Sequence, residues 1–350
     1  MQLTQVKPII ISKPDFISFE SSINAEDTTF EVLESKPFKS ENKLHRKHFI
    51  EANTLAVDLN HLEKDCVIPV FSKDNEITVS HARFIDSVQE AAYKFFSGET
   101  IDSPEVRVSH VVKGRIPEAI YKPVNQLLET DKTIYYERMA FAFEIPTIYE
   151  DFNGNRLNLT VGGVRAYNHE NLYSKKSSEK FKVFIGFKNL VCCNMCISTD
   201  GFKTEIKAMS VHDLTKAVLA LFEQFSPAKQ LHLMSGLKDS YLTEHQFAQL
   251  VGKSKLYQCL PPAKKKLLPN LDFTDTHINM VAKSYYQDDN FSKEEMSGDI
   301  NLWNVYNLFT GANKSSYIDN FLDRSVNATE LIQGINNALY GDTKYKWFIE

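Results

Sequence analysis

The stretch Arg138-Met-Ala-Phe-Ala-Phe-Glu-Ile-Pro-Thr-Ile-Tyr149 places its large apolar residues at alternate positions, and Leu157-Asn-Leu-Thr-Val161 repeats this alternation. A period of two is the signature of a strand with one buried face. The two runs are joined by Asp151-Phe-Asn-Gly-Asn155, in which the pair Asn153-Gly154 readily adopts the positive φ of a tight turn. The sequence therefore predicts a β-hairpin at the centre of the chain.

Further strands are predicted on the C-terminal side of this hairpin. Residues Phe181 to Ser198 are rich in Phe, Val, Ile and Cys, and Asp200-Gly201 offers a second hairpin turn into Phe202 to Met209. Ser210 then has the position of a helix N-cap, and the helix that follows carries an apolar stripe and ends before Pro227. These signals predict an antiparallel meander with a packed helix.

The flanking regions give weaker signals. Ser80 is predicted to cap a helix through Phe96, with Gly98 as its stop. The last 120 or so residues are predicted to be helical. Helices are predicted to start at Thr243-x-x-Gln246, at Thr274 or Asp275, and at Asn327-x-x-Glu330, the last of them ending at Gly341. Leu302 to Phe309 is predicted to be a further amphipathic segment.

We therefore expect an α+β fold with a central antiparallel β-meander and a packed helix, followed by a mainly helical C-terminal region. Residues 1–60 show no sustained period and are predicted to be an extended or partly disordered N-terminal arm. Residues 61–228 would form the α+β domain, and residues 229–350 a helical region packed on it.

Composition limits the class of protein. The 350 residues are 43% hydrophobic and 24% charged, the range of ordinary globular proteins. The N-terminus lacks the pattern of a secretory signal, and no apolar run reaches the roughly 20 residues that a membrane span needs. The five cysteines suit a reduced compartment. We expect a cytoplasmic protein without a membrane partner.

The cysteine cluster Cys192-Cys193-Asn-Met-Cys196 contains the spacing used by zinc sites and by thiol redox motifs. A structural zinc ion needs four ligands, and no second close pair of Cys or His accompanies the cluster. The run is also β-patterned, where cysteine behaves as a small buried hydrophobe. These cysteines are predicted to be structural, with no metal bound.

Other motifs that could carry chemistry have simpler explanations. Gly311-Ala-Asn-Lys314-Ser315 resembles the end of a phosphate loop, but it lacks the preceding Gly and strand, so a helix stop followed by a new cap explains it. Gly162-Gly163 is interpreted as a β-bulge. The ten histidines form no metal-binding pair. No catalytic motif and no cofactor site is recognisable.

Charge is distributed unevenly along the chain. The net charge is -5, yet residues 156–216 hold ten basic residues against five acidic ones, with aromatic residues between them. Cations that follow phosphates beside aromatic rings that stack on bases are typical of single-strand binding. The predicted nucleic-acid-binding residues are Arg165, Tyr167, Lys175, Lys176, Lys182, Lys188 and Lys203. A solvated basic face would account for the same residues.

Several blocks carry a resemblance to known families. With Val111 to Pro117, Thr133 to Arg138, Phe184 to Asn194 and Thr310 to Tyr317, the chain resembles an uncharacterised bacterial family found on conjugative and phage-like elements. The blocks Phe187 to Asn194 and Leu302 to Thr310 are also similar to a broader phage- and plasmid-related family of unknown function. The resemblance implies a mobile-element setting and assigns no catalytic residue.

Three functional hypotheses follow. The first is a mobile-element accessory protein that handles DNA by non-specific single-strand binding or annealing, an idea that the strands-then-helix order supports by analogy with annealing recombinases. The second is a protein-interaction module without catalytic activity, such as an inhibitor of host defence, with a host or element-encoded partner. The third is an unrecognised enzyme. A homo-oligomer is possible under each of them.

Overall fold

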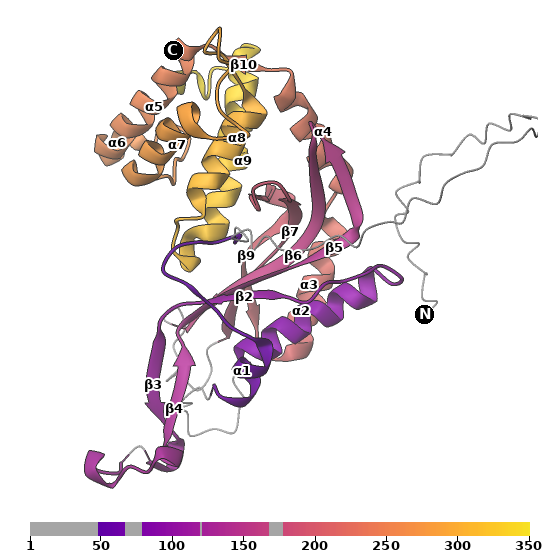
Figure 1. Ribbon diagram of the computed structural model, residues 1–350, viewed down its shortest axis with the longest axis vertical. Helices are drawn as coiled ribbons and strands as arrows, with labels where there is room; N and C mark the ends of the chain where they lie inside the picture. The colour runs from indigo at the N-terminus through magenta and orange to yellow at the C-terminus, as the bar shows by residue number, and fades with distance from the viewer. Residues whose placement is uncertain (1–47, 67–78, 120, 168–177) are drawn as a thin grey trace, which may run out of the picture. The chain divides into compact units, whose positions relative to one another are not determined.

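A seven-stranded antiparallel sheet lies at the centre of the computed structural model, which describes residues 48–66, 79–119, 121–167 and 178–350 (Figure 1). Its strands are β1 (Leu55–Ala56), β2 (Glu105–Val108), β5 (Arg138–Phe152), β6 (Asn155–Ala166), β7 (Glu179–Asn189), β8 (Met195–Cys196) and β9 (Phe202–Ala208). Strands β5 and β6 form the predicted hairpin, and the turn between them places Asn153 at φ 48° and Gly154 at φ 75°. The hairpin prediction is confirmed, because these are the positive φ values that an Asn-Gly turn requires.

Helices pack on both faces of this sheet because successive side chains of each strand point to opposite sides. One face carries Met139, Phe141 and Phe143, which belong to the same buried cluster as residues of α2 (His81–Phe95) and α3 (Val211–Gln224). The other face carries Ala140 and Ala142, which pack with residues of α9 (Ile318–Leu339). Both faces of the sheet are therefore buried in the hydrophobic core.

Two helix caps predicted from the sequence are present in the helices that pack on the sheet. Ser80 accepts a hydrogen bond from the backbone N–H of Arg83 and begins α2, and Ser210 does the same with Asp213 at the start of α3. Each cap satisfies a backbone donor that the first helical turn leaves free. Gly98 has φ 91°, in keeping with its predicted role just after α2.

The C-terminal region is mainly helical, which confirms the predicted α+β class. Its elements are α4 (Pro227–Lys238), β10 (Tyr241–Leu242), α5 (Glu244–Cys259), α6 (Pro262–Lys265), α7 (Asp275–Gln287), β11 (Ile300–Asn301), α8 (Leu302–Asn313) and α9. Thr243 and Gln246 form the predicted capping box of α5. Residues on both sides of position 228 share one hydrophobic cluster and one compact unit.

Two predicted element boundaries were wrong. Asn327 does not open a helix but lies inside α9, which begins at Ile318 and is capped by no side chain. Asp200-Gly201 is not a hairpin turn: it lies in a short 3-10 helix after β8, and β9 returns to pair with β7. In both places a local signal was outweighed by packing against the sheet, which the sequence pattern does not report.

Gly162 and Gly163 are not a bulge either, because the β5–β6 and β6–β7 registers run through both positions without a shift. A Cβ atom on Gly163 would lie 2.6 Å from the Phe84 ring of α2. Glycine is needed there so that the helix can approach the sheet closely.

Residues 48–60, predicted to belong to the arm, pack against the body of the protein. Phe49 and Ile50 are buried beside α9, and the backbone N–H groups of Glu51 and Ala52 donate to the carbonyl oxygen of Lys314. The segment then reaches β1 and α1 (Leu59–Lys64). Residues 1–47 lie outside the described residues.

A second hairpin stands apart from the main sheet. Strands β3 (Val111–Arg115) and β4 (Lys132–Tyr136) pair only with each other among the described strands. Figure 1 shows this hairpin extending away from the main sheet and from the C-terminal helices. The residues between its strands, 116–131, are called the hairpin tip below.

Candidate functional site

Two of the predicted nucleic-acid-binding residues lie in the core. The guanidinium of Arg165 is buried, bonds to the carbonyl oxygen of Val79 and to the Glu179 carboxylate, and lies over the rings of Phe181 and Tyr167 at 4.5 and 4.6 Å from their centroids. Tyr167 is buried as well, and its ring stacks on His81 with 4.3 Å between centroids. These two side chains face α2 and not solvent.

Lys182 and Lys188 point to the opposite side of the sheet. The ammonium of Lys182 pairs with Asp323 of α9 and donates to the carbonyl oxygen of Asp319 at 2.9 Å. Lys188 is 9% exposed, and its ammonium lies 2.8 Å from Glu144. Burial opposes the charge of Lys188, but the hydrogen bond and the charge of Glu144 keep its pKa above the ordinary lysine value.

The structure gives little information about the side chains of the remaining three predicted residues. Lys203 lies in β9 opposite Val183. Lys175 and Lys176 fall outside the described residues. Of the seven predicted side chains, the four that the structure describes therefore occupy two opposite faces of the sheet and do not form one shared contact surface.

Cys192 and Cys196 are buried and Cys193 is partly exposed, and the three cysteines do not lie in a single strand as predicted. Cys192 and Cys193 occupy a turn after β7, with Cys193 at φ 58°, and Cys196 lies in β8. Burial raises the pKa of Cys192 to about 12 and also raises that of Cys196. Burial thus opposes the thiolate form that zinc binding and thiol exchange require. Within the described residues no group of three or more His, Cys, Asp or Glu side chains could hold a metal ion.

One pair of residues has the composition of a nucleophile and its base. The Oγ atom of Ser316 lies 3.1 Å from Nε2 of His277. However, Ser316 is 2% exposed, donates to Oδ1 of Asn313 at 2.7 Å and accepts from the guanidinium of Arg324. A hydroxyl saturated and buried in this way can reach no substrate, so the pair instead joins α7 to the turn between α8 and α9.

The hairpin tip is held together by polar contacts. The Asp131 carboxylate accepts hydrogen bonds from the Lys122 ammonium and from the backbone N–H of Leu128, each at 2.9 Å. The hydrogen bond from Lys122 is the main reason that the pKa of Asp131 lies below the ordinary value. Arg115 of β3 donates to the carbonyl oxygen of Lys122 at 2.7 Å. These bonds order three short 3-10 turns at a site that has little core of its own.

The same tip exposes large apolar side chains. Tyr121 is 96% exposed, Val124 76% and Leu128 63%. Across the part of the chain that the structure describes, no other run of eight residues exposes three large apolar side chains. The sequence analysis did not single out this exposed apolar surface, although Pro117 and Pro123 beside Leu127-Leu128 mark an apolar loop.

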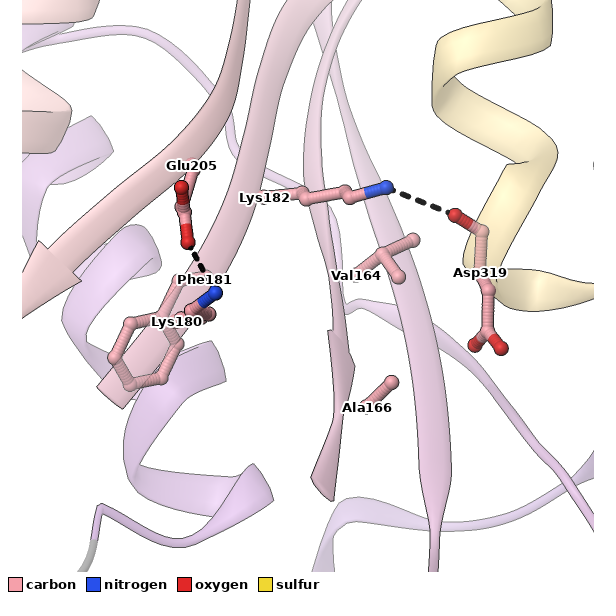
Figure 2. Close-up of a pocket in the computed structure, with 7 residues that line it drawn as sticks. All are labelled: Val164, Ala166, Lys180, Phe181, Lys182, Glu205 and Asp319. Carbon is pink, nitrogen blue, oxygen red and sulfur yellow. Dashed lines mark hydrogen bonds and ion pairs between the residues drawn. The ribbon is translucent and has the colours of Figure 1, made fainter. Parts of the chain in front are cut away.

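A small pocket of about 210 Å³ lies between the sheet and the start of α9. Figure 2 shows Val164 and Ala166 of β6 between two polar sides. On one side, Lys180 and Glu205 form an ion pair with 2.6 Å between them. On the other side, the ammonium of Lys182 donates a hydrogen bond to the main-chain carbonyl oxygen of Asp319. The pocket has an apolar floor and a charged rim of both signs.

The fold defines an α+β protein with a curled antiparallel sheet and a helical C-terminal region. The chain belongs to the family described as "Domain of unknown function, B. Theta Gene description (DUF3871)", whose model matches residues 35–349. Neither the search of curated proteins nor the search of solved structures found a match. The family description names no mobile element, so that setting stays a prediction. None of the helices within the described ranges is long and apolar enough to cross a bilayer.

Proposed function

We propose that the chain is a protein-interaction module whose contact element is the hairpin tip. The observation that carries this proposal is the exposure of Tyr121, Val124 and Leu128 on a tip that polar bonds hold in one conformation. Tyrosine is enriched in the buried centre of protein interfaces, and an ordered loop loses little entropy when it binds. Exposed apolar groups gathered in one place mark interaction sites.

The form of the hairpin supports the same proposal. A two-stranded hairpin is at best marginally stable in water unless it packs on something else. Among the described residues, side-chain contacts join the hairpin to the rest of the protein through β4, where Tyr136 bonds to His61 and the ring of Tyr135 meets that of Tyr167. A partner on the tip would supply the burial that the tip lacks.

The two competing functions have less support. The described pocket, at about 210 Å³, is smaller than the roughly 300–1,000 Å³ of typical ligand pockets. Single-stranded DNA binding would depend on Lys175 and Lys176, since Arg165 and Lys188 are buried and ion-paired. The mobile-element setting, with a host or element-encoded protein as target, belongs to the proposal through the resemblance alone.

Site-specific photocrosslinking tests the proposal. A photoreactive benzoylphenylalanine would replace Tyr121 in the full chain expressed in cells, and Tyr340, exposed at the C-terminus of α9, is the matched control position. We expect a discrete protein adduct at position 121 and none at 340. Serine at both Val124 and Leu128 should abolish the adduct. A nucleic-acid adduct, or the absence of any adduct at 121, would overturn the proposal.

A further inference from the structure

We infer that the outer edge of β3 receives an extended, acidic segment of the partner protein, which adds to the β3–β4 hairpin as a third strand. This inference rests on the proposed function and adds the chemistry of the partner. The edge lies directly beside the hairpin tip, since β3 ends at Arg115 and the tip starts at residue 116. One partner can therefore contact the tip with its surface and the edge with one strand.

The outer edge of β3 pairs with no other described strand. On its far side β4 faces the body of the protein, where Ile134 bridges to Cys66 and the Tyr135 ring lies 6.4 Å from that of Tyr167. Figure 1 shows the same order, with β4 between β3 and α1. Within the described ranges, no hydrogen bond reaches the backbone of residues 111–114 from any element except β4. Strand edges of this kind accept extended chains.

The exposed face of β3 carries a positive charge without a counter-charge. Val111 and Lys113 are both exposed and lie on one face of the strand, because alternate residues of a strand point the same way. In the part of the chain that the structure describes, the Lys113 ammonium forms neither an ion pair nor a hydrogen bond, and β3 itself contains no acidic residue. A carboxylate opposite Lys113 on an added strand would supply the counter-charge.

The carboxylates of the hairpin tip do not cancel this charge. Asp131 pairs with Lys122, and Glu129 pairs with Lys132. The remaining carboxylate of the tip, that of Glu118, lies in a 3-10 turn beyond the end of β3. The edge of β3 therefore attracts an acidic chain.

A second copy of this chain is a poor occupant of the same edge. If two β3 strands paired in antiparallel register about their middle residue, Lys113 of one copy would lie opposite Lys113 of the other. Like charges directly opposite one another destabilise a strand pair, and lysine on an edge strand prevents such association. The partner is therefore a different protein. Its segment has a carboxylate two positions from an apolar residue, so that the two side chains face Lys113 and Val111.

Two synthetic peptides test this inference. The first, acetyl-Thr-Val-Thr-Glu-Thr-Val-Thr-amide, favours an extended conformation through its β-branched residues and places its Glu two positions from each Val. The second has Lys in place of Glu. Each peptide carries a neutral fluorophore, and fluorescence anisotropy with the full chain at low salt measures its affinity.

We expect the glutamate peptide to bind about fivefold more tightly than the lysine peptide, because the cross-strand pair with Lys113 changes from attractive to repulsive. Lys113→Glu should reverse the preference and Lys113→Gln should remove it, with circular dichroism to confirm folding. Lys207→Glu is the matched control, because Lys207 is exposed on β9, which pairs only with β7 among the described strands. The control should leave the preference unchanged.

A second measurement tests the strand pairing itself. Methylation of a backbone nitrogen removes one hydrogen-bond donor, and alternate N–H groups of a strand point to the same edge. Methylation at the Glu of the first peptide and methylation at the Thr before it should therefore differ, one weakening binding strongly and the other little. Equal effects would contradict the addition of a strand.

Three further results would overturn the inference: no binding of either peptide at millimolar concentration, equal binding of both, or a glutamate preference that survives in Lys113→Glu. The photocrosslink at position 121 separates this failure from failure of the proposed function. A protein adduct at 121 without a glutamate preference would leave the interaction module standing and remove the acidic strand. A glutamate preference without an adduct at 121 would keep the edge of β3 as a binding site and remove the tip as the contact element.

Discussion

Asn194 donates a hydrogen bond from Nδ2 to the main-chain carbonyl oxygen of Asn307 at 3.0 Å, and this bond joins the turn after β7 to α8. Asn189 approaches the same residue, with its Nδ2 atom 3.4 Å from Oδ1 of Asn307. All three side chains are buried. They come from the blocks that carry the resemblance to other families, which therefore meet in a structural junction and not in an exposed site.

Replacement of Asn307 by alanine should destabilise the fold. Its side chain accepts from Asn189 and Asn194 and donates to the carbonyl oxygen of Trp303 at 3.0 Å. Buried polar groups left without partners cost about 1–3 kcal/mol each, so we expect the free energy of unfolding to fall by at least that amount. Urea denaturation measures it, with Asn125→Ala on the exposed tip as control. Equal effects of the two changes would contradict the assigned role.

Replacement of Arg165 by glutamine should also lower the free energy of unfolding. The change leaves the Glu179 carboxylate without its buried partner, and loss of one member of a buried ion pair costs about 3–5 kcal/mol. Lys207→Gln, on the exposed side of β9, should stay within about 0.5 kcal/mol. Fluorescence anisotropy with a labelled oligonucleotide provides the second readout. A folded Arg165→Gln chain that loses salt-dependent DNA affinity would assign the residue to DNA binding instead.

Acid should destabilise the protein partly through His277. Burial, and secondarily the charge of Arg324, lowers the pKa of His277 from 6.5 to about 4. Between these values the unfolded chain binds a proton that the folded chain does not, so stability falls as pH drops from 6.5 toward 4. The loss should be on the order of 2 kcal/mol. Urea denaturation at neutral and acid pH should show a smaller acid loss in His277→Gln than in the wild type, and exposed His245→Gln should behave as wild type.

The N-terminal boundary of the fold should lie near residue 47. A chain that starts at residue 47 should unfold with nearly the wild-type midpoint, because it keeps Phe49 and Ile50. A chain that starts at residue 55 loses both side chains and the hydrogen bonds of Glu51 and Ala52 to Lys314, and it should be several kcal/mol less stable. Limited proteolysis with mass spectrometry gives an independent check. Early cleavage between residues 48 and 54 would show that this segment is not part of the core.

The sequence by itself determined the elements whose signals are local. The alternation from Met139 to Ile145 and the Asn153-Gly154 turn specified a strand pair, and Ser80, Ser210 and Thr243 specified helix starts. These signals work because a strand face or a cap depends on residues that are close in the chain. They were enough to predict the α+β class.

Only the tertiary structure decided which charges are free, because the partners are distant in the sequence. Lys182 meets a carboxylate 141 residues away, and Lys188 meets one 44 residues away. A local count of charge therefore could not show that this basic run is largely paired. The exposure of Tyr121 was equally unreadable, since a loop buries or exposes an aromatic ring according to what the rest of the chain places beside it.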